Sequence, residues 1–317
     1  MGLSPQVLAL SFQARYRCRH SGACCTAGWP IPVEPSRAPL LCRLNASGIV
    51  EAIPEQNFLL GTDWSGACAF YDRGARCCTA HRELGPAALP VSCAHFPRRL
   101  VIDEDRVAVS LSHFCPTVAE LLFSPEDDAV SIVEAPSLLA GIDPLEGLDA
   151  RGAWPPLLRP GMLTDRPVYR RWESFVVETL AAAEGGPEAA LARAWGVTEQ
   201  VVRWKPGMGP LEAWVEERTR GSGPQPSEVS LPDHRIPDLL DPFARPVGRY
   251  LAARAFGNWA AYQGDGLLAV LRDVRGGLDI LRAEAVRQRD AARRPLDAPL
   301  LKEAIRRADL RILHLVA

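Results

Sequence analysis

Cys18-Arg-His-Ser-Gly-Ala-Cys24-Cys25 begins the part of the sequence that decides how this chain is organised. All nine cysteines lie between residues 18 and 115, and none follows in the rest of the 317 residues. They are Cys18, Cys24, Cys25, Cys42, Cys68, Cys77, Cys78, Cys93 and Cys115. Because their number is odd and two pairs are adjacent, a disulfide framework is disfavoured, and metal binding or thiol chemistry is favoured.

The start of the chain carries no pattern of export or membrane insertion. Residues 1–17 lack a basic segment followed by a long apolar run, and no stretch of about 18 apolar residues occurs anywhere. We therefore expect a cytoplasmic protein without membrane contact, whose thiols are kept reduced. The formal net charge of -2 at pH 7 gives no basic excess of the kind that nucleic-acid binding requires.

The cysteine pattern indicates a metal site without identifying the metal. Thiolates are soft ligands that suit zinc, copper(I) and iron–sulfur clusters. The spacing matches neither the paired C-x2-C of a zinc ribbon nor the bacterial ferredoxin run, so the metal stays open. Adjacent cysteines rarely bind one ion together, so the vicinal pairs favour a cluster, two ions, or one idle member in each pair. Cys42 follows Leu40 and Leu41 and fits a buried apolar side chain instead.

Four other side chains are candidates for the same site. His81 and His95 each lie within three residues of a cysteine and could complete it, because imidazole suits zinc and iron. The alternative for each is an ordinary hydrogen-bonding histidine. Trp29 could line a substrate site or cap a small core beside the metal. Arg98 could bond a cluster sulfur, bind an anionic ligand or form a surface ion pair.

Composition divides the chain into three segments. Residues 1–125 hold all the cysteines in an irregular pattern, and we expect a metal-binding domain there. Residues 126–165 are Pro-rich and are expected to form a connector. Residues 166–317 have helical periodicity and are expected to form a helical domain. The sequence therefore predicts an α+β fold that is mostly α, with an irregular cysteine-rich domain followed by a helical domain.

Individual elements follow from local patterns. A short hairpin is expected from Arg98–Ile102 and Arg106–Leu111, and a short helix over Pro116–Phe123. The later helices are expected over Arg166–Glu184, Pro187–Trp195, Leu211–Arg218, Pro246–Tyr262, Gly266–Arg289 and Leu300–Leu315, with a loop over Gly221–Pro242. Gly276 and Gly277 lie inside one of these helices and cost about 1 kcal/mol each relative to Ala. They indicate either a kink or a close helix crossing.

Three blocks of the sequence resemble one family. The first runs from Tyr16-Arg-Cys18 to Cys24-Cys25-Thr-Ala-Gly28-Trp29-Pro-Ile31. The second combines Cys68-Ala-Phe70-Tyr-Asp72, Cys78-Thr-Ala-His81-Arg-Glu-Leu84-Gly85 and Leu89-Pro-Val-Ser-Cys93-Ala-His-Phe96-Pro97-Arg98. The third is Ser110-Leu-Ser-His-Phe-Cys115-Pro116-Thr-Val-Ala119-Glu-Leu-Leu122. Together they resemble the flagellin lysine N-methylase (FliB-like) family, within the wider group of YkgJ-type cysteine-cluster proteins that chelate zinc or iron. Residues 249–256, 262–268 and 304–310 are similar to the helical part of the same family.

The resemblance implies a set of ligands and an activity. The thiols that match the family pattern are Cys18, Cys24, Cys25, Cys68, Cys78, Cys93 and Cys115, whereas Cys42 and Cys77 fall outside it. The implied cofactor is a four-iron iron–sulfur cluster, with zinc as the alternative. The implied reaction is methylation of lysine side chains on flagellin, or on another protein substrate, with S-adenosylmethionine as methyl donor.

The residues alone give no further sign of catalysis. The strand, glycine-rich turn and acidic residue of a Rossmann-type methyltransferase do not occur in order, so any S-adenosylmethionine site is unidentified. A cluster with one open iron could hold that molecule directly. The alternative function is a non-catalytic module with a structural zinc or iron and a helical interaction domain. A third hypothesis is a metal carrier or redox sensor with an exposed reactive thiol.

Overall fold

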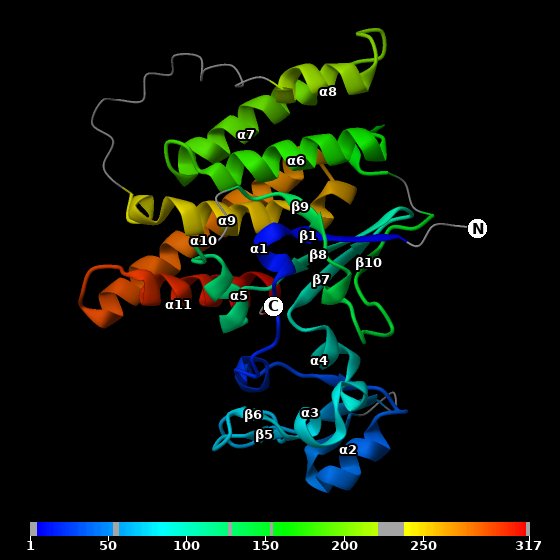
Figure 1. Cartoon of the computed structure of the whole chain (residues 1–317), viewed down its shortest axis with the longest axis vertical. Helices are drawn as coiled ribbons and strands as arrows, with labels where there is room; N and C mark the ends of the chain where they lie inside the picture. Colours follow the sequence, from blue (N-terminus) through cyan, green and yellow to red (C-terminus); the bar gives the residue numbers. More distant parts are fainter. Residues whose placement is uncertain (1–4, 53–56, 126–128, 153–154, 221–237, 315–317) are drawn as a thin grey trace.

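The fold is α+β and mostly helical, as the sequence predicts. The computed structural model describes residues 5–52, 57–125, 129–152, 155–220 and 238–314. The long helices gather at one end of the molecule, a sheet lies in the middle, and a cysteine-rich lobe lies at the other end (Figure 1). Among the described residues, no helix is long and apolar enough to cross a membrane.

The middle sheet has five strands in the order β10-β7-β8-β1-β9. The strands are β1 (Gln6–Leu10), β7 (Arg98–Ile102), β8 (Arg106–Leu111), β9 (Ile132–Glu134) and β10 (Leu148–Asp149). The predicted hairpin is confirmed, because β7 and β8 pair antiparallel with Leu100 opposite Val109. Strand β1 lies parallel to β8 and antiparallel to β9, and β10 lies parallel to β7. The Pro-rich segment 126–165 therefore supplies two strands of this sheet, and also the small pair β11 (Leu157–Arg159) and β12 (Met162–Leu163).

Alternation along the strands gives the sheet two buried faces. Val101 and Ala108 pack with the long helices in the largest apolar cluster, together with Leu10 of β1. Leu100 and Val109 point to the opposite face, where a second cluster forms. This is the two-residue period expected of strands that are covered on both sides. The largest cluster includes residues from all three predicted segments, so it crosses the boundaries expected at residues 125 and 165. The division into three domains stays a prediction.

In the described part of the chain, the long helices are α6 (Arg166–Ala182), α7 (Pro187–Val201), α8 (Leu211–Arg220), α9 (Ala244–Ala255), α10 (Leu267–Ala292) and α11 (Ala298–Asp309). The prediction of one helix over Pro246–Tyr262 is wrong in its second half. Helix α9 ends at Ala255, Gly257 takes a positive φ of 57°, and a 3-10 turn follows over Trp259–Tyr262. After α11 a π-helical turn spans Leu310–His314. Most of the predicted loop Gly221–Pro242 lies outside the described residues, as does Leu315.

The Gly276-Gly277 pair lies inside α10, which continues unbroken over 26 residues. A Cβ atom on Gly277 would fall 3.0 Å from Cζ of Arg254 in α9, and closer still to its Nε. A Cβ atom on Gly276 would meet nothing within 4 Å. Of the two alternatives, the close helix crossing is therefore correct, and it takes place at Gly277.

The cysteine-rich lobe consists of short elements joined by loops. Its strands are β2 (Pro32–Val33), β3 (Ile49–Ala52), β4 (Asn57–Leu60), β5 (Tyr71–Asp72) and β6 (Cys77–Cys78). Its helices are α2 (Ala38–Leu44), α3 (Thr79–Leu84) and α4 (Val91–His95); α1 (Ser11–Ala14) and α5 (Pro116–Leu121) lie next to the middle sheet. The predicted helix over Pro116–Phe123 thus forms, two residues shorter than expected. The lobe buries its own small apolar cluster, which includes Leu41, Phe70 and Leu89.

Candidate metal centre

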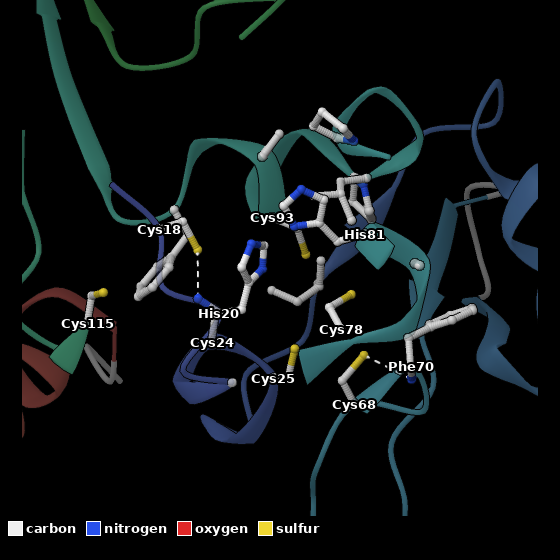
Figure 2. Close-up of a pocket in the computed structure, with 18 of the residues that line it drawn as sticks. Cys18, His20, Cys24, Cys25, Cys68, Phe70, Cys78, His81, Cys93 and Cys115 are labelled. Carbon is white, nitrogen blue, oxygen red and sulfur yellow. Dashed lines mark hydrogen bonds between the residues drawn. The ribbon is translucent and has the colours of Figure 1, made fainter. Parts of the chain in front are cut away.

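A cavity of about 230 Å³ lies where the lobe meets the middle sheet. All the thiols that match the family pattern line it: Cys18, Cys24, Cys25, Cys68, Cys78, Cys93 and Cys115. Figure 2 labels all of them, together with His20, Phe70 and His81. The two thiols that fall outside the pattern are not part of its lining. Cys42 belongs to α2, and the sulfur of Cys77 accepts a hydrogen bond from Arg82.

Backbone geometry brings the first vicinal pair into the cavity. Cys24 and Cys25 lie in a 3-10 turn that begins after Gly22. Gly22 has a φ of 73°, and a Cβ atom there would collide with the ring of Tyr71. Both facts require glycine, because a side chain would be strained and would have no room. The carbonyl of Cys25 then accepts a hydrogen bond of 2.8 Å from the backbone N–H of Cys68, which joins two parts of the lobe.

Three other thiols surround Cys25 in this cavity. Its thiol interacts with those of Cys24, Cys68 and Cys78. We call these four residues the Cys25 group. Figure 2 shows the sulfur atoms of Cys25, Cys68 and Cys78 turned toward one another. The chain therefore gathers cysteines from residues 24 to 78 at one place.

Hydrogen bonding within the Cys25 group separates the acidities of its members. The hydrogen bond from Cys25 lowers the pKa of Cys78 to about 6 and also lowers the pKa of Cys68 and Cys24. The pKa of Cys25 is raised by the same contacts. Burial raises the pKa of Cys93, and the nearby sulfurs of the group raise it further. Because the thiolate is the form that binds metals and the Cys25 thiol has one proton to donate, Cys25 favours that form in one of these neighbours at a time.

Cys18 and Cys115 form a second set of thiols, which lies apart from the Cys25 group in Figure 2. Cys115 immediately precedes α5, its side chain makes no capping hydrogen bond with that helix, and its sulfur interacts with the Tyr16 hydroxyl. Burial nevertheless raises the pKa of Cys115. Cys18 is exposed, and its sulfur accepts a hydrogen bond of 3.4 Å from the backbone N–H of His20.

Two histidines lie among the thiols, and one of them was not predicted. The rings of His20 and His81 are 4.7 Å apart, and both line the cavity. Burial, and to a smaller extent His20, lowers the pKa of His81. Sequence reasoning missed His20, although it lies two residues after Cys18. His95 is not part of the lining; its Nε2 atom is 2.8 Å from the carbonyl oxygen of Pro144, which fits the hydrogen-bonding alternative.

Arg98 and Trp29 occupy defined positions beside the cavity. Arg98 lines it, but its guanidinium donates to carbonyl oxygens, including that of Ala94 in α4, and lies 5.6 Å from the ring centroid of Tyr16. Trp29 packs against Phe96 and Phe114, with ring centroids 5.7 and 5.3 Å apart. Trp29 is not part of the lining, so its contacts agree with the packing alternative.

The donor chemistry of the cavity fits a soft metal, although the side chains are not arranged as a preformed site. Within the described part of the chain, no group of three or more His, Cys, Asp or Glu side chains is placed so that it could hold a metal ion. The thiol of Cys25 interacts with the other thiols of the Cys25 group instead. The surrounding wall is largely apolar and includes Ile31, Leu60 and Phe70. Clustered sulfur donors inside an apolar wall are the surroundings that thiolate-bound metals use.

Comparison with known proteins adds no further assignment. The chain matches no known protein family, no curated protein and no solved structure.

Proposed function

We propose that this protein binds an iron–sulfur cluster, most simply a four-iron cluster, through the Cys25 group and Cys93. The observation that carries the proposal is that these five thiols line one largely apolar cavity, with Cys25 interacting with three of them. Four thiolates are the usual ligands of such a cluster, and the five residues named here supply enough sulfur donors. Cys18 and Cys115 face the same cavity and complete the predicted thiol set. When bound, the cluster would supply electron transfer or an open iron for ligand binding.

The size of the cavity favours a cluster over a single zinc ion. A tetrahedral zinc ion is enclosed directly by its four ligands, at Zn–S distances of about 2.3 Å. Such a site encloses no space for even one water molecule, which takes up about 30 Å³ in the liquid. The cavity of about 230 Å³ bordered by the thiols is much larger than a single ion needs. Zinc remains the alternative metal, because thiolates suit it equally well.

Metal analysis of protein purified without oxygen tests this proposal. We expect a brown protein with iron and acid-labile sulfide in about equal amounts, and a visible absorption band. Cys25→Ser should lose most of the iron. Cys42→Ser is the matched control and should keep it, because Cys42 is not part of the cavity lining. A colourless protein with one zinc per chain would exclude the cluster, and full iron in Cys25→Ser would place the site elsewhere.

The reaction that the resemblance implies extends this proposal: methylation of lysine on flagellin, or on another protein, with S-adenosylmethionine as methyl donor. Two observations are compatible with it, namely the cavity beside the thiols and the His20–His81 pair on its wall. Incubation of the anaerobic protein with flagellin and labelled S-adenosylmethionine tests the reaction. Binding of S-adenosylmethionine that leaves the visible spectrum unchanged would argue against a direct contact with the cluster.

The alternative is a non-catalytic protein whose metal only stabilises the lobe. It is supported by the small apolar cluster of the lobe, which includes Leu41 and Phe70. Small cores commonly depend on a metal for stability. This alternative predicts that metal content and fold stability change together while no methyl transfer is observed under any condition.

A further inference from the structure

We propose that Asp309, near the C-terminal end of the chain, is a positioning residue that holds Cys115 against the cavity. The inference rests on the proposed function in that Cys115 belongs to the thiol set of the cavity. It goes beyond that function because it assigns part of the control of the site to helix α11.

The segment that carries Cys115 is fixed by hydrogen bonds from α11. The backbone N–H of His113 donates to Oδ2 of Asp309 at 2.5 Å, and Nδ1 of His113 lies 3.2 Å from the same oxygen. One residue further on, Nε of Arg306 donates to the carbonyl oxygen of Phe114 at 3.1 Å. Two consecutive residues before Cys115 are therefore bonded to side chains of α11, 196 and 192 positions away in the sequence.

Contacts made by one face of α11 continue along α5. Lys302 Nζ lies 2.6 Å from a carboxylate oxygen of Glu120 and 4.8 Å from the ring centroid of Phe123. Lys302, Arg306 and Asp309 are spaced by four and three residues, so they project from the same side of the helix. This side of α11 thus contacts the chain from His113 to Phe123, with Cys115 inside the contacted stretch.

The carboxylate of Asp309 is buried, so its hydrogen-bond partners must compensate the cost of removing it from water. Its side chain is 2% exposed, and a buried carboxylate is costly unless hydrogen bonds compensate it. On the helical side, Tyr250 donates its hydroxyl to Oδ1 at 3.1 Å, and NH1 of Arg254 lies 3.8 Å from the same oxygen. The other oxygen, Oδ2, is used by His113 alone among the hydrogen bonds described. Oδ1 of Asp309 therefore contacts side chains of the helical core, and Oδ2 accepts hydrogen bonds from the segment that leads to Cys115.

The reactivity of the Cys115 thiol measures this positioning directly. Cys115 is 4% exposed, so an alkylating reagent reaches it only when its segment opens locally. Asp309→Leu removes both carboxylate acceptors and adds no new charge, and Arg306→Met removes the outer hydrogen bond to Phe114 together with the ion pair of Arg306 with Glu303. We expect Asp309→Leu to raise the alkylation rate of Cys115 by roughly tenfold or more, and Arg306→Met to raise it by a smaller factor.

Tyr250→Phe is the matched control, because it removes the contacts of the hydroxyl with Asp309 and Arg254 on the helical side and none with the segment of Cys115. Rates are read by mass spectrometry on the anaerobic full-length protein as purified, with Cys42 in the same digest as internal reference. A structural role alone would make Tyr250→Phe raise the Cys115 rate as much as Asp309→Leu does. That result, or a Cys115 rate unchanged in both Asp309→Leu and Arg306→Met, overturns the inference.

The design separates this inference from the proposed function. If Asp309→Leu fails to fold, Arg306→Met still decides, because Arg306 is partly exposed and its loss leaves the buried network intact. If the purified protein contains no iron, the proposed function fails, yet the alkylation rates of the metal-free protein still test the positioning. If iron is present and the rates behave as expected, both stand.

Discussion

At position 277 a glycine is required because helices α9 and α10 cross there. Any side chain would collide with the buried guanidinium of Arg254. That guanidinium cannot move freely, since its NH2 atom bonds both carboxylate oxygens of Asp273 at 2.9 and 2.8 Å. The adjacent Gly276 has no such neighbour. Two consecutive glycines in one helix therefore have different reasons to be there.

This difference gives a prediction for the pair. Gly276→Ala should raise the free energy of unfolding by up to about 1 kcal/mol, because alanine favours the helix. Gly277→Ala should lower it by about 1–3 kcal/mol, because an added methyl group overpacks the crossing. Urea unfolding followed by circular dichroism measures both. Equal effects of the two substitutions would contradict the close crossing.

The carboxyl group of Asp309 makes stability depend on pH. Burial raises the pKa of Asp309, but its hydrogen bond with His113 and its electrostatic interactions with His113 and Arg254 lower it more, to about 2. An unfolded Asp has a pKa of about 3.9. The group therefore contributes stability above about pH 4, and that contribution is lost as the pH falls toward 2.

We expect the pH dependence to appear in the difference between wild type and Asp309→Asn. At pH 7 the charged group should stabilise the wild type by on the order of 2–3 kcal/mol through this shift. The advantage should shrink between pH 4 and pH 2. Urea midpoints of both proteins at each pH give the difference, in which the titration of groups that do not interact with Asp309 cancels. An advantage that stays constant over this range would show that Asp309 is not ionised in the folded protein.

For single residues, the sequence indicates which thiols line the cavity better than it indicates which other side chains lie beside them. The family pattern separated the thiols that line the cavity from Cys42 and Cys77. The sequence did not indicate His20, because the cysteines already outnumber the ligands that a metal site needs, so a single histidine adds no recognisable signal. Asp309 also received no predicted role, although it lies in a segment quoted for the resemblance. Its contact with His113 spans 196 residues, and no local pattern encodes a contact of that range.

Among the elements, the long helices were predicted well and their ends less well. Helical periodicity locates α6 and α10 because apolar side chains recur on one face. It does not reveal that α9 ends at Ala255, because the apolar pattern continues through the following 3-10 turn. There the backbone N–H of Gly257 donates to the buried Glu173 at 3.0 Å, a tertiary contact that replaces the helical one.

The start of α6 is fixed by a cap that can be tested alone. Asp165 precedes the helix, and its side chain accepts a hydrogen bond of 2.9 Å from the backbone N–H of Val168. Asp165→Ala should lower the free energy of unfolding by about 1 kcal/mol, whereas Asp165→Asn should lose much less, because Asn caps helices as well as Asp does. Chemical unfolding of the two variants measures the difference. If both variants lose the same amount, the negative charge rather than the hydrogen bond is responsible.

Across the whole molecule, the arrangement of the middle sheet was the least predictable feature. Its strands come from residues as distant as Gln6 and Asp149, and β10 has only two residues. Strands this short carry too little pattern to be recognised, and their partners are set by tertiary packing. A buried ion pair between Arg106 and Glu173, 2.6 Å apart, then joins the predicted hairpin to α6. The sequence thus predicts the parts of the fold that are local, whereas long-range contacts decide how those parts meet.

The two ends of the molecule should respond differently to loss of the metal. The helical end shares one large apolar cluster with the sheet, whereas the lobe has a small cluster of its own around Leu41 and Phe70. A domain with a small core usually needs a metal or another crosslink to stay folded, and the binding energy of the metal then becomes folding energy. Without metal, the thiols of the Cys25 group interact with one another and, for Cys68, with the backbone N–H of Phe70, and no ion joins these parts of the lobe. The lobe should therefore loosen while the helices stay folded.

Hydrogen exchange with and without metal tests this expectation. After anaerobic removal of the metal with a chelator, amides between residues 24 and 93 should exchange at least about tenfold faster, since metal binding contributes many kcal/mol to small metal-dependent folds. Amides of α6 and α10 should change little, because their protection follows from a core that contains no thiol of the Cys25 group. Reloading the metal should restore slow exchange in the lobe. Unchanged exchange between residues 24 and 93 would mean that the lobe is held by its apolar cluster alone, and uniform acceleration along the chain would mean that both ends unfold as one unit.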